Sequence, residues 1–298
     1  MSFMNFREKN NMIDDIFAKF DGAFAKNTIR AYRSDFAQYR NWCLQNKLDP
    51  IPATAETMAM YVDYLSKTNK SATICRRINS LGTVLKLSKN LDPTKDPEVI
   101  LALKRMHRKI GRAQEQAAPL TKSLLNQLLN ICDNGTMGIR NQILLRLGYE
   151  TMRRRSELCA FKFEDVGKAP NGKPIIRLNF SKTDQFGTGK VLSISEELLH
   201  FLEKWEGIIG YRGYILRSIN KHGHIGDSLN SASISTILKT LQEGLKSGSN
   251  QQPLSGHSFR VGAALDLLEQ GEPLEKIMLR GGWQSDSTAM KYLRNWAF

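Results

Sequence analysis

The chain has 298 residues, and 41% of them are hydrophobic, which suffices for ordinary cores and is too high for an intrinsically disordered protein. No apolar run approaches the length of a membrane span, and residues 1–15 lack the apolar stretch of a secretory signal peptide. The formal net charge of +14 indicates a polyanionic partner, most often nucleic acid, although an ordinary enzyme can also be basic. We therefore expect a cytoplasmic protein that makes no contact with membranes.

The four cysteines are spread along the chain and form no C-x-x-C pair. We expect reduced thiols in protein cores rather than a disulfide framework or a zinc site. His222 and His224 flank Gly223 in a predicted turn, but they lack Cys or acidic partners at ligand spacing, so we expect no metal there. The cysteines are Cys43, Cys75, Cys132 and Cys159.

Residues 1–110 show helical periodicity and no strand pattern. Apolar residues recur every three to four positions in five segments, at 13–24, 27–46, 54–65, 71–88 and 99–110. Basic side chains fall on the outward faces of these predicted helices, which indicates a nucleic-acid surface, although the run at 104–109 could also be an ordinary solvated face. The candidates for contact with nucleic acid are Arg30, Arg33, Arg40, Arg76, Arg77, Lys86, Arg105 and Arg108.

The segment 111–119 (GRAQEQAAP) is small and polar, and we predict that it links an N-terminal helical domain at 1–110 to a second domain at 120–298. Both parts are basic, with 20 Lys and Arg residues against 12 acidic ones up to position 118 and 23 against 17 beyond it. The fold class predicted is mainly α with a small antiparallel β-sheet in the second domain. The elements expected there are helices at 121–129, 139–150, 196–207 and 228–244, strands at 173–179 and 190–194, and a small extra hairpin from 214–217 and 222–225.

The C-terminal stretch 255–296 is predicted to form three short helices. His257 and Arg260 lie three residues apart at the start of the first helix, so they share a face, and a helix N-terminus favours an anion. Arginine adds a planar fork that matches phosphate oxygens, and histidine adds a group that exchanges a proton near neutral pH. Trp283 follows a glycine pair, and Tyr292 lies in the third helix. Taken singly, each residue also fits surface charge, a satisfied histidine or a core aromatic.

The order and spacing of these residues are more specific than any one of them. An H-x-x-R motif, a G-G-W motif and a tyrosine nine residues after the tryptophan resemble the C-terminal signature of the Cre-like tyrosine site-specific recombinases, in the phage integrase family. The resemblance extends upstream through NTIRAYRSDFAQYRNWC, ALKRMHRKIGRAQEQAAPLT and GYETMRRRSELCAFKFEDV, and it covers about residues 20–298. It implies a helical core-binding domain and a catalytic domain that close as a C-shaped clamp around duplex DNA.

The resemblance also implies a catalytic set that needs no metal or cofactor. Arg154 and Glu157 match the R-x-x-E of the first arginine segment, although the arginines at 153 and 155 leave a slip of one residue open. Lys182, in the loop SKTDQFGTG, matches the mobile catalytic lysine, but it could also be an ordinary lysine at a hairpin tip. The full set implied is Arg154, Glu157, Lys182, His257, Arg260, Trp283 and Tyr292.

The roles implied follow the chemistry of phosphoryl transfer. Tyr292 would attack the scissile phosphate and form a 3′-phosphotyrosine, while two arginines stabilise the charge on the non-bridging oxygens. Lys182 would protonate the leaving 5′ oxygen. His257 would bond a non-bridging oxygen and help move the tyrosine proton. Trp283 would donate its N–H to the phosphate or serve simply as core, and Glu157 would orient its neighbours.

As a relative of this family, the chain would act as a homotetramer on two inverted-repeat DNA sites and pass through a Holliday junction, in a bacterial or phage nucleoid. Two departures stand out. The chain ends six residues after Tyr292, without a further Cre-type helix, so it is either truncated or coupled through its N-terminal helices or Trp296 and Phe298. The helix expected to enter the major groove starts SLNSASIS without a basic residue, and there Asn230 could read adenine.

Two rival functions remain. A topoisomerase IB-like enzyme would share the chemistry but relax DNA without site-specific products. A helical DNA-binding regulator would bind without catalysis, and it would need no combination of Arg154, Lys182, His257, Arg260 and Tyr292.

Overall fold

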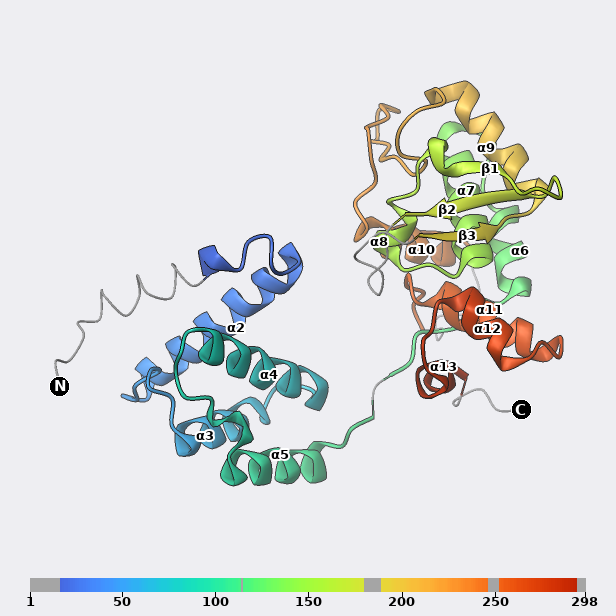
Figure 1. The fold of residues 1–298 in the computed structure, drawn as a ribbon. Helices are drawn as coiled ribbons and strands as arrows, with labels where there is room; N and C mark the ends of the chain where they lie inside the picture. Colours follow the sequence, from blue (N-terminus) through green and yellow to red (C-terminus); the bar gives the residue numbers. More distant parts are fainter. Residues whose placement is uncertain (1–16, 114, 180–188, 246–251, 294–298) are drawn as a thin grey trace. The chain divides into compact units, whose positions relative to one another are not determined.

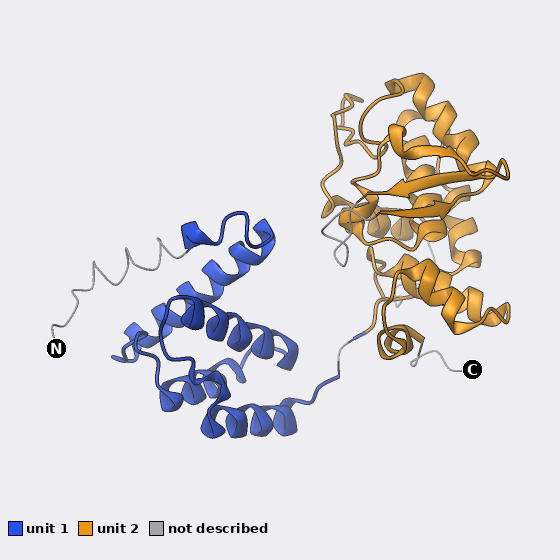
Figure 2. Ribbon diagram, in the orientation of Figure 1, with its two compact units in different colours: residues 1–115 blue, residues 116–298 orange. Residues whose placement is uncertain are grey.

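The computed structural model describes residues 17–113, 115–179, 189–245 and 252–293. They form two compact units, Met1–Glu115 and Gln116–Phe298 (Figure 2). The division falls inside the segment 111–119. No helix among the described residues is both long and apolar enough to cross a membrane.

The first unit contains helices and no strand among its described residues and is drawn in blue to green in Figure 1. Its aromatic core holds the helices together: the ring centroid of Tyr61 lies 5.1 Å from that of Tyr39 and 5.0 Å from that of Trp42. Thr54 caps one helix by accepting from the N–H of Thr57. The helices are α2 (Lys26–Gln45), α3 (Ala55–Leu65), α4 (Ser71–Leu87), the 3₁₀ turn η1 (Pro93–Lys95) and α5 (Pro97–Ile110).

The helix expected at 13–24 ends earlier in the structure. Of its described part, residues 17–19 are helical and residues 20–23 form turns. Gly22 has a φ of +76°, a left-handed conformation that ends helical geometry and that glycine adopts without strain.

The second unit surrounds α7 with helices and carries a small sheet on one side (Figure 1). Leu144 and Leu145 of α7 are fully buried, as expected of a helix covered by α6, α9 and α11. Its elements are α6 (Lys122–Asn130), α7 (Thr136–Thr151), α8 (Arg155–Leu158), η2 (Phe163–Asp165), β1 (Val166–Lys168), β2 (Pro174–Leu178), β3 (Lys190–Ser193), α9 (Glu196–Ile209), α10 (Ser233–Gly244), α11 (Ser258–Glu269), α12 (Leu274–Gly281) and α13 (Asp286–Leu293).

The sheet is antiparallel in the order β1-β2-β3, with Ile176 of β2 opposite both Val166 and Leu192. Alternate residues Ile176 and Leu178 point into the core. The prediction of a mainly α protein with a small antiparallel sheet is confirmed. The third strand, β1, escaped prediction because the three residues Val-Gly-Lys are too short to show a period of two.

Two local predictions in this unit were wrong. The extra hairpin pairs Ile219 with Ile225, while Tyr214 bridges to Lys162 instead. The helix expected from 228 begins at Ser233, because the Asn230 side chain accepts the N–H of Ala232 at 2.9 Å and holds the preceding residues in a turn.

Candidate active site

The end of α7 places three consecutive arginines in three different environments. Helix α7 ends at Thr151, and Met152 takes a left-handed conformation with a φ of +53°. Arg153 is then buried, Arg154 is half-buried and Arg155 is exposed. The change of direction at Met152 thus separates side chains that look equivalent in the sequence.

Arg154 forms the N-cap of α8 and is joined to Glu157 in the following turn. Its Nη1 lies 2.9 Å from Oε1 of Glu157, and its backbone N–H donates to Oε2 at 3.1 Å. Arg155 instead donates from Nη1 to Oγ of Ser235 on α10 at 3.1 Å. Of the three arginines, Arg154 has the geometry of an R-x-x-E pair, so the register suggested by Glu157 agrees with the contacts.

Arg260 lies inside the unit, at the start of α11, with 1% of its surface exposed. Its Nη2 donates to the carbonyl of Gly281 at 2.7 Å. Its guanidinium carbon lies 5.1 Å from the ring centroid of Trp283 and 5.9 Å from that of Tyr292, within cation–π range. Burial and then the nearby charge of Arg154 lower the pKa of Arg260 to about 10, so the group is still charged at neutral pH.

The rings of Trp283 and Tyr292 both lie near the guanidinium of Arg260. Their ring centroids are 5.0 Å apart, and that of His257 is 6.5 Å from Tyr292. The glycine pair before Trp283 has a clear physical role. A Cβ at Gly281 would overlap the indole of Trp283, and Gly282 has a left-handed φ of +66°.

The site has an excess of positive charge. His257 is an exposed residue, yet partial withdrawal of its ring from water is the main factor that lowers its pKa, and the charges of Arg260, Arg155 and Arg154 lower it further. The carboxylate in this group is that of buried Glu157. A cluster of this composition favours an anion.

Three buried donors of the site have no hydrogen-bond partner among the described residues: Nε and Nη1 of Arg260 and Nε1 of Trp283. A buried donor without an acceptor is unfavourable by about 1–3 kcal/mol, and by more when it is charged. All three are donors and belong to adjacent side chains, so a group with several acceptor atoms would satisfy them together. A phosphate group has this chemistry.

Five of the seven catalytic candidates therefore share one neighbourhood, namely Arg154, His257, Arg260, Trp283 and Tyr292. Glu157 joins them through Arg154. Lys182 falls in 180–188, outside the described residues; the strands on either side of that segment are β2 and β3.

Sequence reasoning missed the role of the first arginine of the triplet, Arg153. It is 2% exposed and packs against the same turn as Arg260. A run of three arginines was the available signal, but periodicity does not predict a buried charge. It also missed Gln116, whose side-chain amide donates to the backbone carbonyl of Tyr292.

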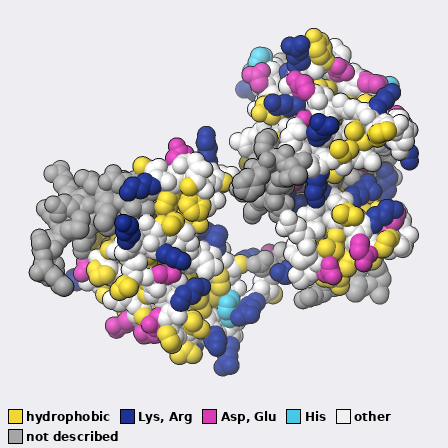
Figure 3. Space-filling model, in the orientation of Figure 1, with side chains coloured by type: hydrophobic (Ala, Val, Ile, Leu, Met, Phe, Trp, Pro, Cys, Tyr) yellow, Lys and Arg dark blue, Asp and Glu magenta, His cyan; other side chains and the backbone are white. Residues whose placement is uncertain are grey.

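Several candidates for contact with nucleic acid have partners inside their own unit. Arg76 and Arg77 both lie against buried Asp35, with Nη2 of Arg76 2.9 Å from Oδ1. Arg105 is 3.8 Å from Asp63 and largely exposed. The other candidates in this unit are the exposed Arg30, Arg33, Lys86 and Arg108 and the half-buried Arg40. Lys and Arg side chains are spread over the visible faces of both units (Figure 3).

The chain resembles known proteins in sequence and in fold. Residues 119–297 match the model of the Phage integrase family. The chain is 28% identical to an integrase/recombinase xerD homolog of Selenomonas ruminantium, over 98% of this chain and 89% of the relative. It is 26% identical to recombinase cre of Escherichia phage P1, over 92% and 85%. Its fold resembles that of a lambda integrase tetramer bound to a Holliday junction, with a TM-score of 0.60, 15% identity and coverage of 93% and 78%.

Proposed function

Because the chain belongs to the phage integrase family of tyrosine recombinases, we propose that it is a site-specific DNA recombinase in which Tyr292 attacks a scissile phosphate. The observation that carries this proposal is the set of buried, unpartnered donors on Arg260 and Trp283 beside the Tyr292 ring. A phosphodiester seated there would accept from all of them while its phosphorus faces the phenol.

The proposed charge stabilisation is supplied by fixed cations. As the phenol oxygen of Tyr292 bonds to phosphorus, negative charge grows on the non-bridging oxygens. Arg260 and Arg154, whose forked donors suit phosphate, would stabilise that charge, and Trp283 would add a neutral N–H. No step in this scheme calls for a metal ion.

Protons move in two places. The lowered pKa of His257 keeps its imidazole neutral at pH 7, so it is able to accept the proton that Tyr292 loses. The bond from phosphorus to the 5′ oxygen breaks, and that oxygen takes a proton from Lys182. The products are a 3′-phosphotyrosine at Tyr292 and a free 5′ hydroxyl. Glu157 would orient Arg154 through the contact at 2.9 Å.

The assembly is proposed at the level of the family. The first unit would serve as the core-binding domain and the second as the catalytic domain, and together they would close as a C-shaped clamp on duplex DNA. Four protomers would join two inverted-repeat sites, as a bacterial or phage nucleoid protein. The named relatives are recombinases, and a lambda integrase tetramer of similar fold is bound to a Holliday junction.

A covalent-trapping assay tests the function. Wild-type protein is incubated with a set of inverted-repeat duplexes from its genomic neighbourhood, each nicked near the centre so that a cleaved strand end diffuses away. We expect a covalent protein–DNA adduct on one of them, and Tyr292→Phe should still bind that duplex but form no adduct. An adduct with Tyr292→Phe would assign the nucleophile elsewhere.

The same assay separates the rivals. A regulator without catalysis binds and forms no adduct on any duplex. A topoisomerase-like enzyme forms adducts and relaxes supercoiled plasmids that lack the site, whereas the proposed recombinase yields recombinant products that depend on two copies of the site.

A further inference from the structure

Arginine side chains hold the turn between α12 and α13 from two directions. Arg260 donates to the carbonyl of Gly281 at 2.7 Å, and Nη2 of Arg153 donates to the carbonyl of Arg280. Nε of Arg153 also donates to the carbonyl of Thr151 at 2.7 Å. The buried guanidinium of Arg153 therefore bridges the end of α7 to the end of α12.

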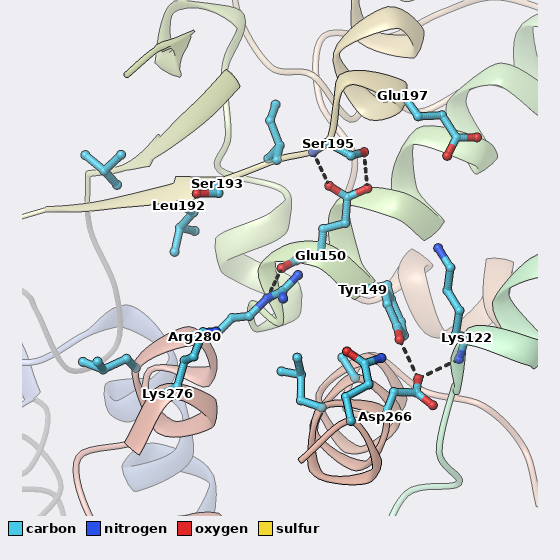
Figure 4. A pocket seen from close by; sticks show the side chains of 16 residues that line it. Lys122, Tyr149, Glu150, Leu192, Ser193, Ser195, Glu197, Asp266, Lys276 and Arg280 are labelled. Carbon is cyan, nitrogen blue, oxygen red and sulfur yellow. Dashed lines mark hydrogen bonds between the residues drawn. The ribbon is translucent and has the colours of Figure 1, made fainter. Parts of the chain in front are cut away.

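A second set of hydrogen bonds joins α12 to α7, with a donor on α12 and an acceptor on α7. Nε of Arg280 donates to the carbonyl of Glu150 at 3.0 Å, and the carboxylate of Glu150 accepts from the N–H and the Oγ of Ser195, each at 2.8 Å. Figure 4 shows these contacts along a cavity of about 740 Å³. Helix α12 is thus joined to α7 by bonds that run in both directions, and α7 in turn is joined to the start of α9.

Arg153 also fits the shape of the turn. A Cβ at Gly282 would come within 2.7 Å of Nη1 of Arg153, so the guanidinium occupies the space beside the glycine backbone. The next residue is Trp283, whose ring lies 5.0 Å from that of Tyr292. Movement of this turn would therefore be passed to the proposed nucleophile through one side chain.

Stability alone gives little reason for an arginine here. Among the described residues, Arg153 takes part in no ion pair, and burial is the main factor that lowers its pKa. Even buried ion pairs can often be replaced by apolar side chains of similar volume without loss of stability, and Arg153 has no ion pair to compensate for its burial. What an apolar side chain cannot supply is the pair of directed bonds to the carbonyls of Thr151 and Arg280.

We propose that Arg153 is a positioning residue for DNA cleavage, which fixes the turn 281–283 and, through Trp283, the orientation of Tyr292. The inference rests on the proposed function of Tyr292. Arg153 itself touches neither the phosphate nor the nucleophile, so its loss should reduce the rate of cleavage and leave the affinity for DNA unchanged.

The test compares Arg153→Met with Arg140→Met. Arg140 is also a buried arginine of this unit and lies in α7. It donates to the backbone carbonyl of Arg217 and to the side chain of Asn141, and it has no ion pair among the described residues. We expect Arg153→Met to lower the single-turnover rate of adduct formation roughly 10²-fold, because small misplacement of reacting groups has effects of that size. Arg140→Met should cleave at the wild-type rate. Equal rates for the two variants would overturn the proposal.

A second readout does not depend on cleavage. Trp283 fluorescence reports the turn directly, so Arg153→Met should change the emission of the protein, and the change should disappear when both proteins carry Trp283→Phe. If wild-type protein forms no adduct on any duplex, the proposed function fails while this measurement still tests the turn. An emission unchanged by Arg153→Met would remove the positional role.

Gly282→Ala gives an independent variant if Arg153→Met does not fold. The added methyl group meets the Arg153 guanidinium and the left-handed backbone, so it should displace the same turn. A soluble Gly282→Ala protein that cleaves at the wild-type rate would count against the inference, and a slow one with unchanged DNA affinity would support it.

Discussion

Both units contain a cluster of arginines, and the two clusters differ in what neutralises them. In the first unit, Asp35 is 2% exposed and faces both Arg76 and Arg77. In the second, Arg260 is as deeply buried but takes part in no ion pair among the described residues, and two of its nitrogens have no partner there. The first cluster joins α2 to α4 and is neutralised by Asp35, although Nε of Arg77 also lacks a hydrogen-bond partner among the described residues. Arg260 has no such carboxylate among the described residues, which is why we propose an anion for the second cluster.

The largest expected effect that tests this contrast is on Arg260. Arg260→Lys keeps the positive charge but removes the planar fork that leaves two donors for phosphate. We expect the single-turnover rate of cleavage to fall about 10²–10³-fold, the range seen when one transition-state donor is lost. DNA affinity, measured in parallel, should change little. A cleavage rate within threefold of wild type, which corresponds to a change of about 0.6 kcal/mol in the activation free energy, would show that charge alone is sufficient.

For the first cluster the expected effect is on stability. Asp35→Asn leaves the two arginines without their shared carboxylate, and the free energy of unfolding of the first unit should fall by about 1–3 kcal/mol. Urea unfolding followed by far-UV circular dichroism measures this. The folded variant should form adducts at the wild-type rate, since this cluster has no proposed part in the chemistry. A loss of cleavage rate without loss of stability would show that the first cluster also takes part in the reaction.

Sulfate offers a smaller and simpler probe of the second cluster. An anion that binds the folded site stabilises it, by about 1.4 kcal/mol at a tenfold excess over its Kd, or roughly 3–6 °C in Tm. Sulfate stabilises many proteins without binding to a site. The Tm of wild type and of Arg260→Met is therefore measured in sulfate and in chloride at equal ionic strength. The difference in Tm between sulfate and chloride should shrink in Arg260→Met. An unchanged difference would mean that the donors do not bind anions.

The smallest expected effect concerns pH. The pKa of His257 is lowered by partial burial and by the charges of Arg260, Arg155 and Arg154, so between its folded value and about 6.5 the unfolded chain binds more protons than the folded one. Stability from this source is complete above about pH 6.5 and is lost as the pH falls toward the folded pKa. Tm should therefore drop more in wild type than in His257→Gln between about pH 7.5 and pH 5.5. Parallel drops would contradict the sign of the shift.

Much of the fold follows from apolar periodicity, because helices such as α4 and α11 bury one face and expose the other. Periodicity did not predict that Arg154 and Arg260 would meet, since they are more than 100 residues apart; that expectation came from the resemblance to the family. The burial of Arg153 was beyond either approach. Its acceptors are backbone carbonyls at the ends of two helices, and carbonyls leave no mark on the pattern of side chains.

The left-handed conformation of Met152 has a consequence for insertions and deletions. One residue more or less in α7 would turn the point where the chain leaves the helix by about 100°. The three arginines that follow would then lose their present surroundings, so that the buried Arg153, the proposed phosphate ligand Arg154 and the exposed Arg155 would be misplaced without any other change in sequence. A homologous chain could thus keep the same three arginines and still be inactive. The length of α7, set where Met152 ends it, is therefore a part of the active site in its own right.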